Sequence, residues 1–465
     1  MATEIKQEIS VQSNPITEGV IWKQLLLFFF PILFGTFIQQ LYNTADAMIV
    51  GRFVGKEALS AVGGSTGMLT LMIVEFFVGL SSGSSVLVSQ YYGAKRPEMV
   101  SLAVHTSVAF SIGIGFVTMI AGIILTPWML TAMGTPADVL ELSIIYLRVY
   151  FLGITFNLLY NTGAAILRAV GDSRRPLYIL MASCGTNIIL DVLLVIVLGL
   201  GVLGAALATI LSQGLSALLV LACLMRAKDS YQLRLRNIRL DSNMQMKIIK
   251  VGIPAGFQSI MYGISNVIVQ SGINSLGTDT MAAWAAYSKI DALYWMMLSS
   301  FGISVTTFVG QNYGANKSKR VHGGVRWCMV LALAASVFVS GSLYRWGVNC
   351  MYLFTTDAEV IRIGIDMMHY LLLLYSFYVP IEVLSGALRG VGDCWMPMIL
   401  CLFGVCVIRI GWVLFAVPLK RDMYTIMFSF PLTWVITMVM FIVYYLLFSR
   451  LGIRKREKER KEIRQ

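Results

Sequence analysis

The stretch PILFGTFIQQLYNTAD, residues 31–46, places a proline and then a carboxyl group inside an apolar run long enough to cross a bilayer. A charged Asp in hydrocarbon costs at least about 2.5–3.5 kcal/mol on insertion scales, so such an acid normally faces a protein interior or a wet cavity and has a function. Gln39, Tyr42 and Asp46 lie at i, i+3 and i+7, on one face of a helix. Pro31 removes one backbone hydrogen bond, so we expect a hinge there.

The composition of the whole chain places this stretch in a membrane protein. Of the 465 residues, 57% are hydrophobic and only 13% are charged, and the mean hydropathy is +0.75. These values are far too apolar for an ordinary soluble domain. Several apolar windows exceed the length of about 18 to 20 residues that spans the hydrocarbon core. The fold class is therefore predicted to be an all-α membrane protein.

Apolar runs bounded by polar residues, glycine or proline predict twelve transmembrane helices. Their expected ranges are 20–50, 58–91, 98–126, 137–168, 175–198, 201–225, 248–275, 281–312, 319–346, 358–389, 395–418 and 424–449. The longest polar connection divides them into two six-helix bundles. The predicted organisation is an N-terminal segment (1–19), an N-lobe (20–225), a cytoplasmic linker (226–247), a C-lobe (248–449) and a basic tail (450–465).

The net charge of +12 reflects topology rather than a nucleic-acid partner. Most Lys and Arg residues lie in the linker, in the tail and in the other connections on the side of the termini. The positive-inside rule therefore places both termini in the cytoplasm of a multi-pass protein of the inner (plasma) membrane. The seven cysteines lack metal-ligand spacing and are expected to pack as small apolar residues.

An internal repeat relates the two halves. VSQYYGA (88–94) returns as VGQNYGA (309–315), and LRAVGD (167–172) returns as LRGVGD (388–393), both with the same offset along the chain. Two matches at one offset indicate a six-helix unit repeated in the same orientation. The lobes should therefore be related by a pseudo-twofold axis along the membrane normal, with substrate between them.

Polar side chains recur at i, i+4 within three predicted helices of the first half. The pairs are Asn157 with Asn161, Asn187 with Asp191, and Thr209 with Gln213. Together with Asp46 they can build one polar cluster. The amides and hydroxyls can equally serve as hydrogen bonds between helices, whereas the two aspartates are costlier and indicate function.

The second half carries different ionisable residues. The positions equivalent to Asp46 and Asp191 are uncharged, while Glu382 stands at the position equivalent to Asn161. Lys289 and Asp291 are interpreted as a structural ion pair. The two halves are therefore expected to be chemically unequal.

Nucleotide chemistry is not indicated. The chain contains no Gly-x-x-x-x-Gly-Lys-Ser/Thr sequence, and GLGVLG (199–204) follows a membrane span rather than a short strand. Energy for transport is expected to come from an ion gradient or from the substrate's own gradient. We expect neither an enzyme nor a bound cofactor.

Jointly, the motifs resemble those of the multidrug and toxic compound extrusion (MATE) family over nearly the whole chain. The segments that carry the resemblance are YNTADAMIVG (42–51), QYYG (90–93), LRAVGD (167–172), NIILD (187–191) and GAALAT (204–209). The resemblance implies a V-shaped cleft between two bundles and alternating access. It also implies export of cationic or amphipathic organic compounds in exchange for H⁺ or Na⁺. Small organic substrates and membrane lipid are the expected partners of a monomer.

The resemblance also implies site residues. The N-lobe ion site of the family matches Asp46, Asn161, Asn187, Asp191 and Thr209, of which Asp46, Asn187 and Asp191 would hold a Na⁺ ion. Candidate substrate-cavity residues are Gln39, Tyr42, Asn157, Gln213, Gln258 and Glu382. Gln258 stands where members with a C-lobe cation site carry an acid, although Glu382 matches their helix-ten acid. The pattern is closer to the DinF-like branch.

Two choices remain open at this point. Two neighbouring acids can share a proton, which favours H⁺ as the coupling ion, but the same oxygen-rich set suits Na⁺. A lipid-linked oligosaccharide flippase of the same superfamily is an alternative function, although a pyrophosphate calls for a more cationic cleft. A non-transporting receptor or scaffold is a second alternative, but it does not require buried acids.

Overall fold

The computed structural model describes residues 15–452, and in that range it contains only helices and their connections. The first half comprises α1 (Pro15–Glu18), α2 (Ile21–Phe53), α3 (Lys56–Gly63), α4 (Ser65–Gly93), α5 (Pro97–Ala132), α6 (Ala137–Ala169), α7 (Arg174–Asp191), η1 (Val192–Val197) and α8 (Gly201–Met225). A 3₁₀ turn, η2 (Leu235–Asn237), lies in the linker. The second half comprises α9 (Ser242–Asn274), α10 (Thr278–Gly314), α11 (Ser318–Tyr352), α12 (Ala358–Leu372), η3 (Tyr375–Phe377), α13 (Val379–Gly390), α14 (Trp395–Cys401), η4 (Leu402–Val407), α15 (Ile408–Leu419), α16 (Met423–Val443) and η5 (Tyr444–Phe448).

These elements group into the twelve predicted spans. Among the described residues, ten helical segments are long and apolar enough to cross a membrane, and α12 with α13, bent by 41°, makes an eleventh. The twelfth is α9, whose hydropathy is lowered by polar residues such as Gln258 and Asn266. Short π-helical stretches continue α7, α14 and α16, which widens these helices locally.

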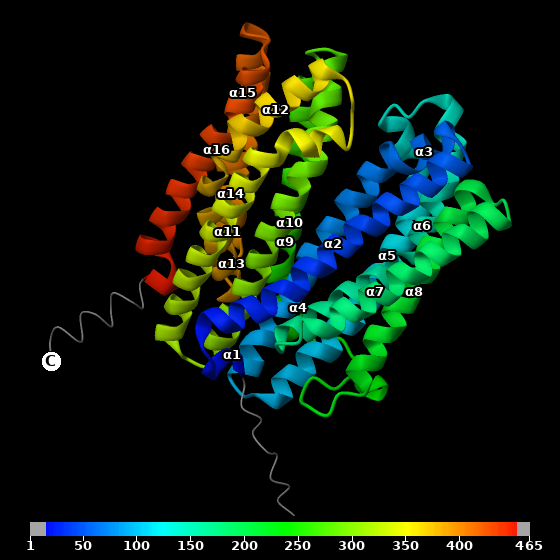
Figure 1. The fold of residues 1–465 in the computed structure, drawn as a ribbon. Coiled ribbons are helices and arrows are strands. Elements are labelled where there is room, and N and C mark those ends of the chain that lie inside the picture. The colour runs from blue at the N-terminus through cyan, green and yellow to red at the C-terminus, as the bar shows by residue number, and fades with distance from the viewer. Residues whose placement is uncertain (1–14, 453–465) are drawn as a thin grey trace, which may run out of the picture.

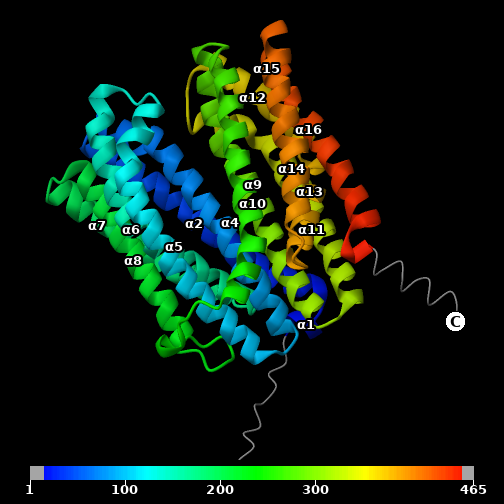
Figure 2. The same cartoon turned by 180° about the vertical axis from the view of Figure 1, so that it is seen from behind.

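The two halves meet at one end of the molecule and diverge toward the other. Figure 1 shows α1 and the α8–α9 connection at the end where the halves meet, with α3 and α15 at the diverging end. The view from behind shows the same separation of α5–α8 from α10–α16 (Figure 2). The basic linker therefore lies at the end where the halves meet, which we call the closed end.

Glycines allow α4 and α9 to cross in close contact between the halves. A Cβ atom at Gly79 would lie 2.5 Å from the backbone nitrogen of Gly256. One turn further along, a Cβ atom at Gly83 would lie 2.9 Å from the nitrogen of Gly252. Small residues of this kind let helix backbones approach within a membrane, so no side chain separates the two helices at this crossing.

Backbone conformations repeat with the sequence. Lys95 and Asn316, which are related by the offset of the repeat, are non-glycine residues with positive φ angles of 53° and 56°. Gly171 and Gly392, related by the same offset, have φ angles of 102° and 85°. Equivalent helix ends thus adopt equivalent turns, as expected for two copies of one six-helix unit.

The second half begins earlier than predicted. The predicted C-lobe starts at residue 248, whereas α9 begins at Ser242, because the side chain of Asp241 accepts a hydrogen bond of 2.8 Å from the backbone N–H of Met244. The connection between the halves is therefore 226–241 rather than 226–247. Most of the predicted terminal segments, namely residues 1–14 and 453–465, lies outside the described residues.

Candidate functional site

Two buried aspartates from different helices meet inside the first half. Asp46 of α2 is 8% exposed and Asp191, the last residue of α7, is fully buried. Their carboxyl groups lie close enough to repel each other when both are ionised. One bound proton relieves this repulsion, so the pair is suited to holding a proton.

The atoms around this pair lack partners. Within the described part of the chain, Oδ1 of Asp46, both carboxyl oxygens of Asp191 and both side-chain amide atoms of Asn187 have no hydrogen-bond partner. The ion pairs of residues 15–452 do not include either aspartate. Buried polar atoms are normally satisfied, so this group is suited to a proton or to a hard cation such as Na⁺.

Polar residues of α6 and α8 complete the cluster. Tyr146 lies close to Thr209 and to both aspartates, and Tyr150 lies close to Gln213. Both tyrosines are buried, and they lie one helical turn apart. The sequence does not single them out, because each is an aromatic residue in an apolar helix, and their i, i+4 spacing is the only signal.

The substrate-cavity residues of α2 lie along the same helix as Asp46. Tyr42 is half-buried and close to Asp46, so these two predicted residues are brought together. Gln39 is exposed. The burial of this predicted helical face therefore increases along α2, from the exposed amide of Gln39 to the buried carboxyl group of Asp46.

Asn161 and Asn157 contact each other on α6. The amide of Asn161 donates to the side chain of Asn157 at 2.9 Å. The next residue, Tyr160, donates to the carbonyl of Pro176 at 3.4 Å. Pro176 is fifteen residues before Asp191 on α7, about 20 Å along the helix at 1.5 Å per residue. The structure shows Asn161 bound to Asn157, and the place of Asn161 in the ion site stays a prediction.

Pro31 marks the place where α2 changes its partner. Before the proline, Phe29 stacks on Phe301 of the second half, with ring centroids 4.0 Å apart. After it, Gly35 faces Leu177 and Leu180 of α7 in the first half. The helix is continuous through Pro31. The missing hydrogen bond thus lies at the boundary between the two packing environments.

The second half holds its acids differently. Glu382 lies 3.4 Å from Arg389, so its charge is compensated and it does not form a free acid equivalent to Asp46. The side-chain amide of Gln258 donates to Sγ of Cys401 at 3.2 Å. These two predicted cavity residues therefore already have protein partners.

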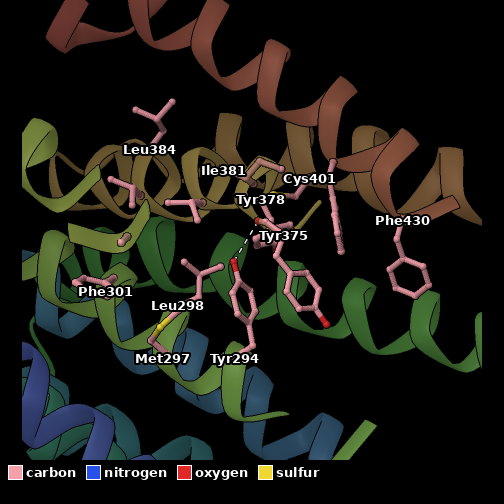
Figure 3. Packing of buried hydrophobic residues seen from close by; sticks show 14 of the residues in the cluster. Tyr294, Met297, Leu298, Phe301, Tyr375, Tyr378, Ile381, Leu384, Cys401 and Phe430 are labelled. Atoms are coloured by element: carbon pink, nitrogen blue, oxygen red, sulfur yellow. Dashed lines mark hydrogen bonds between the residues drawn. The ribbon is translucent and has the colours of Figure 1, made fainter. Parts of the chain in front are cut away.

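The expected ion pair of Lys289 with Asp291 is not formed. Residues two apart on a helix face different directions, and Lys289 is exposed. Asp291 instead accepts hydrogen bonds from Trp295, Tyr287 and Tyr375. Figure 3 shows Tyr375 beside Tyr294 and Tyr378, in the packed interior of the second half.

Comparison with known proteins gives consistent matches over most of the chain. The model of the MatE family matches residues 31–193 and 254–413, one segment in each half. The chain is 28% identical over 434 residues to the probable multidrug resistance protein YoeA of Bacillus subtilis, covering 91% of this chain and 93% of the relative. It is 23% identical over 383 residues to the multidrug export protein MepA of Staphylococcus aureus, covering 82% and 81%.

Solved structures share the architecture. The outward-facing conformation of a multidrug resistance MATE family transporter of the MOP superfamily gives a TM-score of 0.86 at 23% identity, covering 93% of this chain and 97% of that one. Crystal structures of a MATE in the straight and in the bent conformation each give a TM-score of 0.88, at 23% and 22% identity, covering 96% of this chain and 99% of those.

Proposed function

Since the chain belongs to the MatE family and is a multi-pass membrane transporter rather than an enzyme, we propose that it is a secondary active antiporter. It exports cationic or amphipathic organic compounds in exchange for an ion by alternating access. The names of its relatives, a probable multidrug resistance protein and a multidrug export protein, support this substrate class. The observation that carries the proposal is the pair of buried, unpaired acids Asp46 and Asp191.

The proposed coupling ion is H⁺. Two neighbouring carboxyl groups with no basic partner repel one another when both are ionised, and one proton relieves this repulsion. Protonated Asp46 can then donate a hydrogen bond to a neighbour such as the unpartnered amide oxygen of Asn187. Na⁺ is the competing ion, because Asp46, Asn187 and Asp191 also offer oxygen ligands.

Pro31 provides a proposed route from ion binding to movement. The part of α2 beyond Pro31 carries Asp46, whereas the part before it packs on the second half through Phe29. A change in charge at Asp46 therefore acts on a helix that can bend between its two attachments. The straight and bent conformations named for a structurally similar MATE are consistent with such a movement.

The proposed orientation follows from charge. Positive-inside bias assigns the closed end, where the basic linker lies, to the cytoplasm of the plasma membrane. The diverging end then faces outward, and both termini are cytoplasmic. The protein is proposed to act as a monomer.

Proteoliposomes that contain the purified full-length protein and a substrate gradient test the function and the ion together. Uphill movement of ethidium driven by an imposed pH gradient, with matching proton flux in the absence of Na⁺, is the expected result. Ethidium exchange that requires Na⁺ and carries no proton flux rejects proton coupling. Liposomes that show no ethidium movement with either ion reject the antiporter.

A further inference from the structure

The second half contains a carboxylate that is held by aromatic residues. On α10, Asp291 accepts a hydrogen bond of 2.8 Å from Nε1 of Trp295 and one of 3.4 Å from the hydroxyl of Tyr287. The hydroxyl of Tyr375 also donates to it. All three donors are neutral, so they orient and stabilise the carboxylate but leave its negative charge uncompensated.

No cationic side chain among the described residues compensates the charge of Asp291. None of the ion pairs within residues 15–452 includes Asp291. The two arginines in the interior of the second half are engaged elsewhere: Arg389 with Glu382, and Arg409 with Thr433 at 3.1 Å. A carboxylate removed from water without an opposite charge is costly, and an incoming cation would offset that cost.

The surroundings of Asp291 suit an organic cation. Trp295 packs edge-on against Tyr378 with ring centroids 4.7 Å apart, and both rings contact Trp434. Aromatic faces attract cations within about 6 Å, and tryptophan does so most strongly. The same aromatic group already accommodates one cation, since the guanidinium of Arg409 lies 4.3 Å from the ring centroid of Phe430.

One face of α10 leaves this group accessible. Trp284, Ser288, Asp291 and Trp295 follow one another at i, i+4, i+7 and i+11, and all four are half-buried rather than enclosed. Trp284 also contacts Phe430, which packs on Trp434 as well. A planar cation would place its charge at Asp291 and its rings along the tryptophans.

We propose that Asp291, together with Trp284 and Trp295, binds the positive charge and the aromatic rings of a planar organic cation within the second half. The assignment rests on the proposed function, because it takes the bound cation to be a transported substrate. It separates the substrate charge from the coupling ion: the substrate engages Asp291, and the ion engages Asp46 and Asp191.

The test is equilibrium binding to the purified full-length protein in detergent. Ethidium is the cationic probe and Nile red the neutral aromatic one, each followed by fluorescence anisotropy. Asp291→Asn should weaken ethidium binding at least tenfold and change Nile red binding less than twofold. Asp291→Glu, which keeps the charge, should restore most of the ethidium affinity. Asp279→Asn, at an exposed acid of the same helix, is the matched control and should match wild type.

Two results would overturn the site. Wild-type ethidium affinity in Asp291→Asn would show that the carboxylate takes no part. An equal loss of both probes, without rescue by Asp291→Glu, would show a packing role only. Failure of the proposed function gives a different result. Wild-type protein would then bind ethidium through Asp291 but would not exchange it in liposomes, so the binding site would stand and the antiporter proposal would be rejected.

Discussion

Gln90 and Gln311 make the same hydrogen bond in opposite directions across the two halves. Nε2 of Gln90 donates to the carbonyl of Gly390 at 2.8 Å, and Nε2 of Gln311 donates to the carbonyl of Ala169 at 2.6 Å. The two donors are related by the offset of the repeat, and so are the two acceptors. Each amide therefore binds the end of a helix in the other half, and the two bonds together fasten the closed end.

Removing the two hydrogen bonds of Gln90 and Gln311 should favour separation of the halves at the closed end. A net hydrogen bond contributes about 0.5–1.5 kcal/mol, so the Gln90→Ala, Gln311→Ala double variant should shift the equilibrium between conformations by roughly tenfold or more. Thiol labelling of a cysteine introduced at the closed end, measured in inside-out vesicles, should rise accordingly. The control is Gln232→Ala, whose amide binds the Met225 carbonyl within the same half. Unchanged labelling in the double variant would contradict the fastening role.

Neutralising either buried acid should stop ion-driven export without unfolding the protein. Asp46→Asn and Asp191→Asn each remove a charge that has no basic partner, so no ion pair is broken. We expect gradient-driven ethidium exchange to fall at least a hundredfold while the melting temperature stays near that of wild type. Glu141→Gln, at an exposed acid of α6, should leave exchange intact. Exchange at the wild-type rate in either aspartate variant would show that the ion site is wrong.

Pro31→Ala tests the hinge of α2. Alanine restores the backbone donor that proline lacks and stiffens the helix between its two attachments. Turnover in proteoliposomes should therefore fall several-fold, with little change in ethidium affinity. Pro127→Ala, at another proline inside a helix, should have the smaller effect on turnover. A variant with normal turnover and altered affinity would assign Pro31 to substrate binding instead.

The crossing of α4 and α9 should not tolerate a methyl group. Gly79→Ala places its Cβ atom against the backbone of Gly256, and overpacking of this kind typically costs about 1–3 kcal/mol. The thermal unfolding temperature in detergent should therefore drop. At Gly113 on α5 a Cβ atom meets nothing within 4 Å, so Gly113→Ala should leave the unfolding temperature unchanged or raise it. Equal temperatures for the two variants would contradict the close crossing.

The twelve spans and the duplication could be predicted from the sequence because both depend on local patterns. Long apolar runs report membrane spans directly, and identical motifs at one offset report equivalent turns, such as those at Lys95 and Asn316. The start of α9 is harder to predict, because an N-cap aspartate in a polar linker gives little hydropathy signal.

The composition of the sites was harder to predict. Asp46 and Asp191 stood out, since a carboxyl in an apolar helix is conspicuous. Polarity alone groups Asn161 with them, and its place in the ion site stays a prediction. Proximity in the chain pairs Asp291 with Lys289, whereas its partner Tyr287 lies one turn away on the same helix. Its partner Tyr375 comes from another element, and sequence spacing does not reveal that contact.

The close crossing at Gly79 imposes a mechanical coupling on the two ends of the molecule. Gly79 is the central residue of the 29-residue α4, so the crossing acts as a fulcrum with two equal arms, each about 21 Å long at 1.5 Å per residue. A rotation of 10° about this point would move each tip by roughly 4 Å, and in opposite directions. That distance suffices to break the hydrogen bond of Gln90 near one tip while the other tip swings inward. Because the two ends of a rigid α4 move in opposite directions about this crossing, opening of one end would accompany closing of the other.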